Sequence, residues 1–193
     1  MNLLDKFHHW RRKLRWNKQY KRGRWDSLQS EKEAKRYQKI VDFAKKFGPK
    51  DPSVLDIGSG DGVLTRRFGA TNYSFFMGID FSSISIEKAN AKKFLNAIFE
   101  THDAIKFTPN RPFDVIVFNE AFYYIHDAKK QLVLDRMLGS LTENGIIVTS
   151  IYREGHGCWE YFKEHPKLEE LAFETITTDE ELRYWKIGVY QKS

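Results

Sequence analysis

The stretch that decides the fold of this chain is Val54-Leu55-Asp56-Ile57-Gly58-Ser59-Gly60-Asp61-Gly62-Val63-Leu64. A short apolar run leads directly into glycine at every second position, and apolar residues resume after it. Glycine adopts backbone conformations closed to other residues and lets a ligand approach the main chain. The first N–H groups of a following helix can bind a carboxylate or another anion. The stretch therefore predicts a buried strand, a ligand-binding turn and a helix.

The spacing of these glycines differs from that of dinucleotide sites. The fingerprint G-x-G-x-x-G needs glycine at position 63, where this chain has valine. Asp56, at the end of the strand, would also repel a pyrophosphate. It suits a ligand with positive charge, such as an amino acid ammonium group near a sulfonium. The turn therefore indicates S-adenosylmethionine rather than NAD as the ligand.

Two more acids follow the next two predicted strands. Asp80 ends the second strand, 18 residues after Gly62, and could accept hydrogen bonds from both hydroxyls of a ribose. Asp103 follows the third strand and could accept one from an adenine amino group. Each acid taken alone could instead be a helix cap or a turn residue. Because the carboxyl ends of parallel strands meet at one edge, the three acids are expected on one rim of the sheet.

Short apolar runs alternate with helical segments through the rest of the chain. Strands are predicted at 54–57, 75–79, 97–101, 115–118 and 146–151, and helices at about 62–69, 83–94, 128–140 and 157–165. The connection at 105–112 contains two prolines and is too short for a full helix. Two further runs, 171–177 and 184–191, are joined by a polar turn at 178–181 and predict an antiparallel hairpin. The pattern predicts a Rossmann-like, doubly wound α/β sheet of about seven strands.

Two helices are predicted ahead of the sheet. In the first, apolar residues recur with helical spacing opposite basic ones, at Leu3, Leu4, Phe7, Trp10 and Leu14. The second starts with a capping box, Ser30 with Glu33, carries an apolar stripe and ends at Gly48-Pro49. The stripe consists of Ala34, Tyr37, Val41 and Ala44. We expect residues 1–50 to form a basic helical arm or lid packed on a domain of residues 51–193.

The positive charge is concentrated in this arm. The net charge is +6, and residues 1–25 hold nine Lys or Arg against one acid, which leaves −2 for the rest of the chain. Residues 6–24 could therefore contact RNA, an anionic membrane surface or an acidic substrate. No apolar run is long enough to span a bilayer, and the first residues lack a signal-peptide core. We expect a cytoplasmic protein, with peripheral binding at the inner membrane surface as an alternative.

Residues 54–151 resemble the S-adenosylmethionine domain of class I methyltransferases, and the closing hairpin matches that family's last two strands. The resemblance implies that Asp56 and the glycine turn hold the methionine part of the cofactor, Asp80 the ribose, and Asp103 with Ala104 the adenine. The segments 20–26 and 119–125 are similar to small bacterial methyltransferases of sugars and secondary metabolites, such as the nodulation-type N-methyltransferases. The full predicted cofactor set is Asp56, Gly58, Ser59, Gly60, Gly62, Asp80, Phe81, Asp103, Ala104, Asn119, Tyr20, Arg24 and Trp25.

This resemblance implies methyl transfer to a nitrogen or oxygen of a small molecule or saccharide, with S-adenosylhomocysteine as product. The reaction is an in-line displacement, for which positioning is the main requirement and a general base helps a hydroxyl. Glu120 is the candidate base, and Tyr123 and His126 are further catalytic candidates. The plainer interpretation of His126 is that it starts the next helix with Asp127. The predicted substrate-binding residues are Tyr124, Arg153, His156 and Trp159.

Several other classes are disfavoured. Positions 119–122 read Asn-Glu-Ala-Phe rather than the Asn/Asp-Pro-Pro-Tyr/Phe turn common in methylation of base amines. The single cysteine, Cys158, excludes an internal disulfide and lies away from the place of a cytosine C5 nucleophile. Clustered carboxylates are not evident, so no metal is expected. An RNA methyltransferase that uses the arm, or a non-catalytic cofactor-binding or membrane-docking domain, stays open as an alternative, and the oligomeric state is not indicated.

Overall fold

The computed structural model of the chain describes residues 3–180 and 182–193, with side chains from Arg11 onward. The side chains of Leu3, Leu4, Phe7 and Trp10, and Glu181 of the predicted hairpin turn, lie outside the described part. The strands are β1 (Ser53–Ile57), β2 (Phe75–Asp80), β3 (Ala97–Thr101), β4 (Phe113–Asn119), β5 (Leu141–Tyr152), β6 (Leu168–Thr177) and β7 (Tyr184–Lys192). The helices are α1 (Leu3–Lys21), α2 (Glu31–Phe47), α3 (Val63–Phe68), α4 (Ser83–Ala91), α5 (Asp127–Gly139) and α6 (Glu160–Lys163), with 3-10 turns η1 (Asp26–Gln29) and η2 (Phe122–Tyr124).

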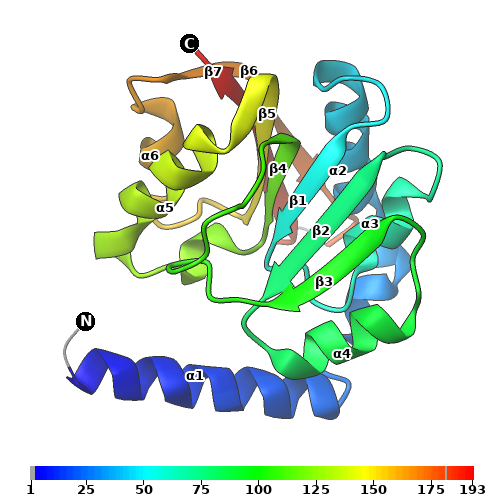
Figure 1. Cartoon of the computed structure of the whole chain (residues 1–193), viewed down its shortest axis with the longest axis vertical. Helices are drawn as coiled ribbons and strands as arrows, with labels where there is room; N and C mark the ends of the chain where they lie inside the picture. The colour runs from blue at the N-terminus through cyan, green and yellow to red at the C-terminus, as the bar shows by residue number, and fades with distance from the viewer. Residues whose placement is uncertain (1–2, 181) are drawn as a thin grey trace.

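The seven strands form one sheet in the order β3-β2-β1-β4-β5-β7-β6 (Figure 1). The first five strands are parallel, and β7 pairs antiparallel with both β5 and β6. The predicted Rossmann-like sheet and its closing hairpin are thus confirmed. β5 begins at Leu141, earlier than predicted, because Leu141 pairs with Phe113 and the ladder resumes at Ile146 after a shift in register. The turn-like residues between these two pairs therefore belong to the strand.

Helices cover both faces of the sheet, and the strands bury side chains on each (Figure 1). Along β4, Val115 and Val117 pack towards α2 and α3, whereas Ile116 and Phe118 pack towards α5 and α6. Every residue of β1 is buried, as expected for a central parallel strand. This packing fixes the carboxyl ends of β1, β2 and β4 at one edge of the sheet.

The start of α2 differs from the predicted capping box. Ser30 is the N-cap residue, but its side chain makes no cap hydrogen bond. Glu33 is instead held by the guanidinium groups of Arg36, at 2.7 Å, and Arg183. These two cations occupy the Glu33 carboxylate, so the side chain does not turn back to cap the helix. The predicted end of the helix at Gly48 is confirmed.

Helix α1 lies across the carboxyl edge of the sheet (Figure 1). Leu14, predicted on a packed apolar stripe, is 48% exposed. The side chains of Trp16 and Tyr20 face the protein instead of Leu14, because positions 12, 16 and 20 lie on the packed side of α1. Three hydrogen bonds between described residues fasten α1 to the body: from Lys88 Nζ to the carbonyl of Tyr20, from the Ser82 hydroxyl to Asn17 Oδ1, and from the Arg12 guanidinium to the carbonyl of Tyr124. In the described part of the chain, no helix combines the length and apolar character that crossing a bilayer requires.

Candidate functional site

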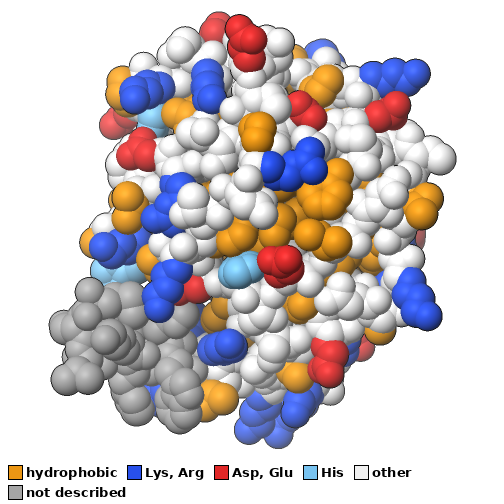
Figure 2. Space-filling view, in the orientation of Figure 1, with side chains coloured by type: hydrophobic (Ala, Val, Ile, Leu, Met, Phe, Trp, Pro, Cys, Tyr) orange, Lys and Arg blue, Asp and Glu red, His pale blue; other side chains and the backbone are white. Residues whose placement is uncertain are grey.

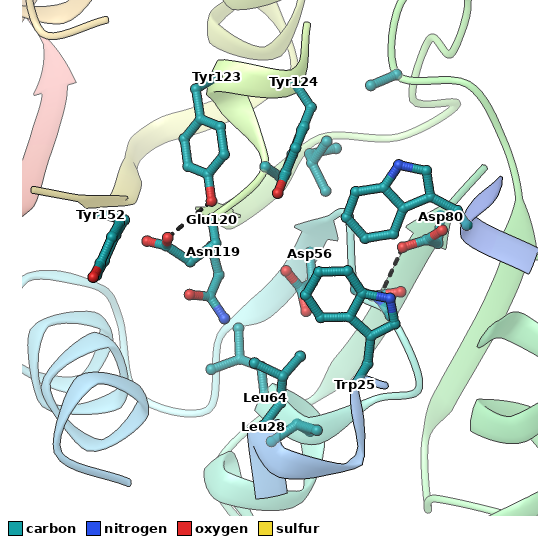
Figure 3. Close-up of a pocket in the computed structure, with 18 of the residues that line it drawn as sticks. Trp25, Leu28, Asp56, Leu64, Asp80, Asn119, Glu120, Tyr123, Tyr124 and Tyr152 are labelled. Carbon is teal, nitrogen blue, oxygen red and sulfur yellow. Dashed lines mark hydrogen bonds between the residues drawn. The ribbon is translucent and has the colours of Figure 1, made fainter. Parts of the chain in front are cut away.

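A cavity of about 470 Å³ lies at the carboxyl edge of the sheet, beneath α1 and η1. We call its two parts the glycine end and the Glu120 end (Figure 3). The glycine end is lined by residues 56–61, 79–81 and 103–105, with Trp16, Tyr20 and Trp25 above them. The Glu120 end is lined by residues 119–121 and 123–124, with Tyr152, Arg153, Arg183 and Trp185 from β5 and the β6–β7 hairpin.

Asp56 is the most deeply buried acid of the glycine end. Its side chain is 1% exposed, and its Oδ1 has no hydrogen-bond partner among the described residues. Burial, reinforced by the nearby carboxylate of Asp80, raises the pKa of Asp56 to about 8. An uncompensated buried carboxylate is costly. The site is therefore suited to a ligand that brings a cation to Asp56.

The turn after β1 accepts only glycine at two of its positions. Gly58 and Gly60 have φ values of 80° and 57°. A Cβ on Gly58 would lie 2.7 Å from Cβ of Ala121, and one on Gly60 would lie 2.7 Å from the Tyr20 hydroxyl oxygen. These two positions must therefore lack a side chain, because Ala121 of the loop after β4 and Tyr20 of α1 pack directly against the turn. Next to it, Ser59 Oγ is buried without a hydrogen-bond partner in the described structure.

Gly62 plays a different part from the other glycines. It is the N-cap of α3 with φ of 81°, and a Cβ there would meet the rings of Phe94 and Phe99 at 2.9 Å and 3.2 Å. It does not line the cavity. The structure thus gives Gly62 a packing role against Phe99 of β3 and no contact with the cavity where the cofactor was expected.

The other two predicted acids lie on the same rim. Asp80 accepts hydrogen bonds from the N–H groups of Gly60, at 3.1 Å, and Ser82, at 2.8 Å, which ties the ends of β1 and β2 together. Burial raises the pKa of Asp80 to about 6. Asp103 accepts from the N–H of Ile105 at 3.0 Å and lines the cavity beside Ala104. The structure thus brings together the three acids that the sequence placed at successive strand ends.

Two indole rings roof the glycine end. Trp16 of α1 and Trp25 stack with ring centroids 4.7 Å apart and planes within 8° (Figure 3 labels Trp25). Tyr124 and Phe81 meet the Trp16 ring edge-on at 5.0 Å and 5.9 Å. Sequence analysis missed Trp16, although its spacing from Tyr20 is helical. Arg24, predicted to contact the cofactor, is exposed above the Trp25 ring and does not line the cavity.

Glu120 sits at the opposite end in a strained conformation, with φ of 56°. Its Oε2 accepts a hydrogen bond from the Tyr123 hydroxyl at 2.9 Å, and its Oε1 accepts one from the Ser150 hydroxyl at 3.0 Å (Figure 3). Arg36 lies 3.9 Å from Oε1. Burial raises the pKa of Glu120 despite these contacts. Non-glycine residues in this region of φ commonly mark functional sites.

Arg36, which sequence analysis did not identify, organises this end. It is 1% exposed, lies over the rings of Tyr37 and Trp185, and donates hydrogen bonds to Glu33 and to Asn119 Oδ1. Asn119 is thereby oriented at the end of β4. Little in the sequence indicated this role, because an arginine next to the apolar stripe of a helix is normally expected to point into solvent.

Three of the predicted catalytic and substrate-binding residues do not line the cavity. His126 is exposed at the N-cap of α5, where its Nδ1 accepts from the N–H of Ala128, as the plainer interpretation held. Trp159 is buried against Phe162 and Phe173, and His156 is exposed beside a shallow groove on that side. The predicted catalytic role of His126 and the predicted substrate contacts of His156 and Trp159 therefore have no support from the cavity. Tyr124 and Arg153 do line the cavity, and Arg153 donates from Nε to the carbonyl of Leu182 at 2.9 Å.

Comparison with known proteins decides the family. A family model described as a methyltransferase domain matches residues 29–187. The chain belongs to this methyltransferase domain family. The predicted class is therefore confirmed. Methyltransferases of this family take their methyl group from S-adenosylmethionine, which confirms the predicted cofactor.

Among curated proteins, the chain is similar to an uncharacterized methyltransferase of Anoxybacillus flavithermus. The two are 33% identical over 96 residues, which is 49% of this chain and 44% of the relative. The chain spans less than half the length of the curated relatives it matches.

Two solved structures share the fold of this methyltransferase. N-methyltransferase NodS from Bradyrhizobium japonicum in complex with S-adenosylhomocysteine is 18% identical, with a TM-score of 0.74 over 87% of this chain and 91% of that one. The 1,6-didemethyltoxoflavin-N1-methyltransferase of Burkholderia thailandensis is 16% identical, with a TM-score of 0.77 over 96% and 90%. At these identities the likeness concerns the fold.

The residues of the glycine end fit S-adenosylmethionine. The ligand's amino acid ammonium group would provide the missing partner of Asp56, and Ser59 Oγ offers a second buried polar atom without a partner in the described structure. Asp80 keeps lone pairs for ribose hydroxyls after accepting from Gly60 and Ser82. Among the described residues, no group of three or more His, Cys, Asp or Glu side chains could hold a metal ion.

Proposed function

We propose that this protein transfers the methyl group of S-adenosylmethionine to a nitrogen or oxygen atom of a small molecule or saccharide bound at the Glu120 end. The observation that supports this most is the shape of the cavity. One half-open space of about 470 Å³ contains both Asp56 and Glu120, and Trp16 and Trp25 cover part of it. A cavity of this size beneath a roof suits a small acceptor better than a folded nucleic acid.

S-adenosylmethionine supplies a methyl group already activated on a sulfonium. Asp56 and the turn at Gly58–Gly60 bind the methionine part, Asp80 the ribose, and Asp103 with Ala104 the adenine. Trp16, Tyr20 and Trp25 act as a lid that excludes water. Together these side chains hold the donor so that only the Glu120 end is open to an acceptor.

Glu120 orients the acceptor and receives its proton. Each oxygen of the carboxylate already accepts one hydrogen bond, from Tyr123 or Ser150, and retains a lone pair for an acceptor N–H or O–H. Because burial raises its pKa, Glu120 is a better base than an exposed glutamate. Tyr124, Tyr152 and Arg153 line the space around it and are the proposed substrate contacts.

The experiment uses S-adenosylmethionine with a labelled methyl group and pools of metabolites and nucleotide sugars. We expect label in a small product, and we expect Glu120→Gln to lower kcat about 10²-fold or more while S-adenosylhomocysteine binds as before. Label that enters only RNA or protein would contradict the proposed acceptor class. Unchanged turnover in Glu120→Gln would remove Glu120 from the reaction.

Ser150→Ala is the matched comparison. It removes one hydrogen bond to Glu120 Oε1 but leaves the carboxylate in place. We expect a loss of turnover smaller than that of Glu120→Gln, with a shifted pH profile. A larger loss in Ser150→Ala would indicate that the hydroxyl, not the carboxylate, contacts the acceptor.

A further inference from the structure

The outer face of α1 consists of exposed side chains of two kinds. Successive residues of an α-helix turn by about 100° around its axis. Positions 11, 14, 15 and 18 therefore lie on one side of α1, opposite positions 12, 16 and 20, which line the cavity. The side chains on the outer side are all exposed, and they are Arg11, Leu14, Arg15 and Lys18, continued by Lys21 and Arg22. We call this set the outer face of α1.

The outer face carries only positive charge. The sequence has no Asp or Glu between Lys6 and Trp25. Arg15, Lys18 and Arg22 form no ion pair within the described structure, although Lys88 beside the end of α1 pairs with Asp26. Like charges three and four residues apart on a helix repel each other. Figure 2 shows Lys and Arg side chains gathered along the lower edge of the molecule, where Figure 1 places the second half of α1.

We propose that the outer face of α1 docks on an anionic lipid bilayer surface, with Leu14 at the boundary of the acyl chains. Charge complementarity supports an anionic partner, because phosphate headgroups would relieve the repulsion along the helix. The exposed Leu14 within the basic face supports a bilayer in particular, because an apolar side chain beside cations can enter the boundary between headgroups and acyl chains.

The described aromatic residues of α1 favour lipid over RNA as the partner of the outer face. Single-stranded RNA is bound by stacking its bases on exposed aromatic rings. The aromatic side chains described on α1, Trp16 and Tyr20, line the cavity on the opposite side of the helix. The outer face thus offers cations and a leucine, and among its described side chains it has no aromatic ring. Docking would place the cavity roof directly beneath the bilayer surface.

The first test is co-sedimentation of the full chain, saturated with S-adenosylhomocysteine, with vesicles of phosphatidylcholine with or without phosphatidylglycerol. We expect binding only to the anionic vesicles and weakening by salt. The triple variant Arg15→Glu, Lys18→Glu, Arg22→Glu should bind at least about 100-fold more weakly. The matched variant Lys35→Glu, Lys50→Glu, Lys106→Glu changes three exposed lysines elsewhere and should bind nearly as wild type does.

Calorimetry with S-adenosylhomocysteine checks that both triple variants are folded. Absence of wild-type binding to anionic vesicles at physiological ionic strength would overturn the proposal. So would equal losses in the two triple variants, because binding would then follow net charge rather than the outer face. If the wild-type chain ignores vesicles but binds a single-stranded RNA oligonucleotide through α1, the partner is RNA and the proposal is wrong.

A second test reports on Leu14 itself. Cys158 is fully buried, so Leu14→Cys provides a selectively reactive thiol for an environment-sensitive fluorophore. We expect a blue shift in emission on anionic vesicles, and no shift when the same label is placed by Lys35→Cys. An unchanged spectrum at position 14 on vesicles that do bind the protein would overturn the placement of Leu14 at the interface.

Discussion

The buried carboxylates at the two ends of the cavity differ in whether the chain itself provides them with an ion-pair partner. At the glycine end, Asp56 has no ion-pair partner in the described structure, and its pKa is raised to about 8. At the Glu120 end, Glu33 and Glu120 lie against the guanidinium of Arg36, and Glu33 also against that of Arg183. One end is left incomplete for a cationic ligand, whereas the other is neutralised by the chain itself.

This difference indicates where stability and binding reside. A buried ion network stabilises the fold only while all its members are present. A buried carboxylate without a partner lowers the free energy of unfolding, and binding of a cationic ligand raises it again. Variants at the two ends should therefore separate the two properties.

Arg36→Met should give the largest effect, and it should appear as lost stability. The change leaves Glu33 and Glu120 buried without their shared cation, which costs about 3–5 kcal/mol in comparable cases. We expect a lower free energy of unfolding in urea at neutral pH. The double variant Glu33→Gln, Arg36→Met should recover part of the loss. A single variant as stable as wild type would show that the network is not needed for the fold.

Asp56→Asn should act on binding instead. Loss of a charged hydrogen bond of about 1.5–3 kcal/mol corresponds to about 10- to 100-fold weaker binding of S-adenosylhomocysteine in calorimetry. Asp114→Asn is the matched control, since Asp114 holds Ser53 and Thr142 at the opposite end of the strands. Equal affinity in the Asp56 variant would contradict the electrostatic basis of the site.

Asp56→Asn should also change how the free energy of unfolding depends on pH. Folded Asp56 has a pKa of about 8, against about 4 in the unfolded chain. The folded state thus retains a proton that the unfolded state has released, so stability falls as pH rises from about 4 to 8. Without cofactor, Asp56→Asn should become more stable than wild type across this range, by at most about 1.4 kcal/mol per pH unit. Thermal melts from pH 5 to 8 measure this, and parallel profiles for the two proteins would refute it.

Trp25→Ala should have the smallest effect, a loss of about two- to tenfold in affinity for S-adenosylhomocysteine, because one ring of the stacked roof is removed. Trp16→Ala should behave alike, since the two rings stack on each other. Leu14→Ala, on the opposite side of α1, is the control and should bind normally. Affinity that is unchanged in both tryptophan variants would remove the roof from cofactor binding.

The two ends also differ in how far the sequence predicts them. The glycine end depends on a contiguous turn and on acids that directly follow predicted strands, so local pattern suffices to place Asp56, Asp80 and Asp103 on one rim. The Glu120 end depends on strand order. Arg36 comes from α2 and Arg183 from the turn before β7, and the adjacency of β4, β5 and β7 brings both to the same end of the cavity as Glu120.

Each difference between the predicted and the observed position of a side chain has an identifiable cause. His126 follows a strand-end loop like a catalytic residue, yet its Nδ1 satisfies a helix N–H, which is the ordinary role of a polar side chain at that position. Trp159 was predicted from its place after β5, but its ring packs against the core. The capping box at Ser30 and Glu33 failed because two distant guanidinium groups hold Glu33. Tertiary contacts decided the positions of Trp159 and Glu33, and a local helix cap decided that of His126.

The parallel stack of Trp16 and Trp25 has a consequence for spectroscopy. Two indoles at 4.7 Å with nearly parallel planes couple their electronic transitions, which produces a paired signal in near-ultraviolet circular dichroism. Any ligand or bilayer that moves α1 relative to η1 would change the angle between the rings and hence the amplitude of that signal. The near-ultraviolet circular dichroism of the protein therefore reports the position of the lid without an added dye.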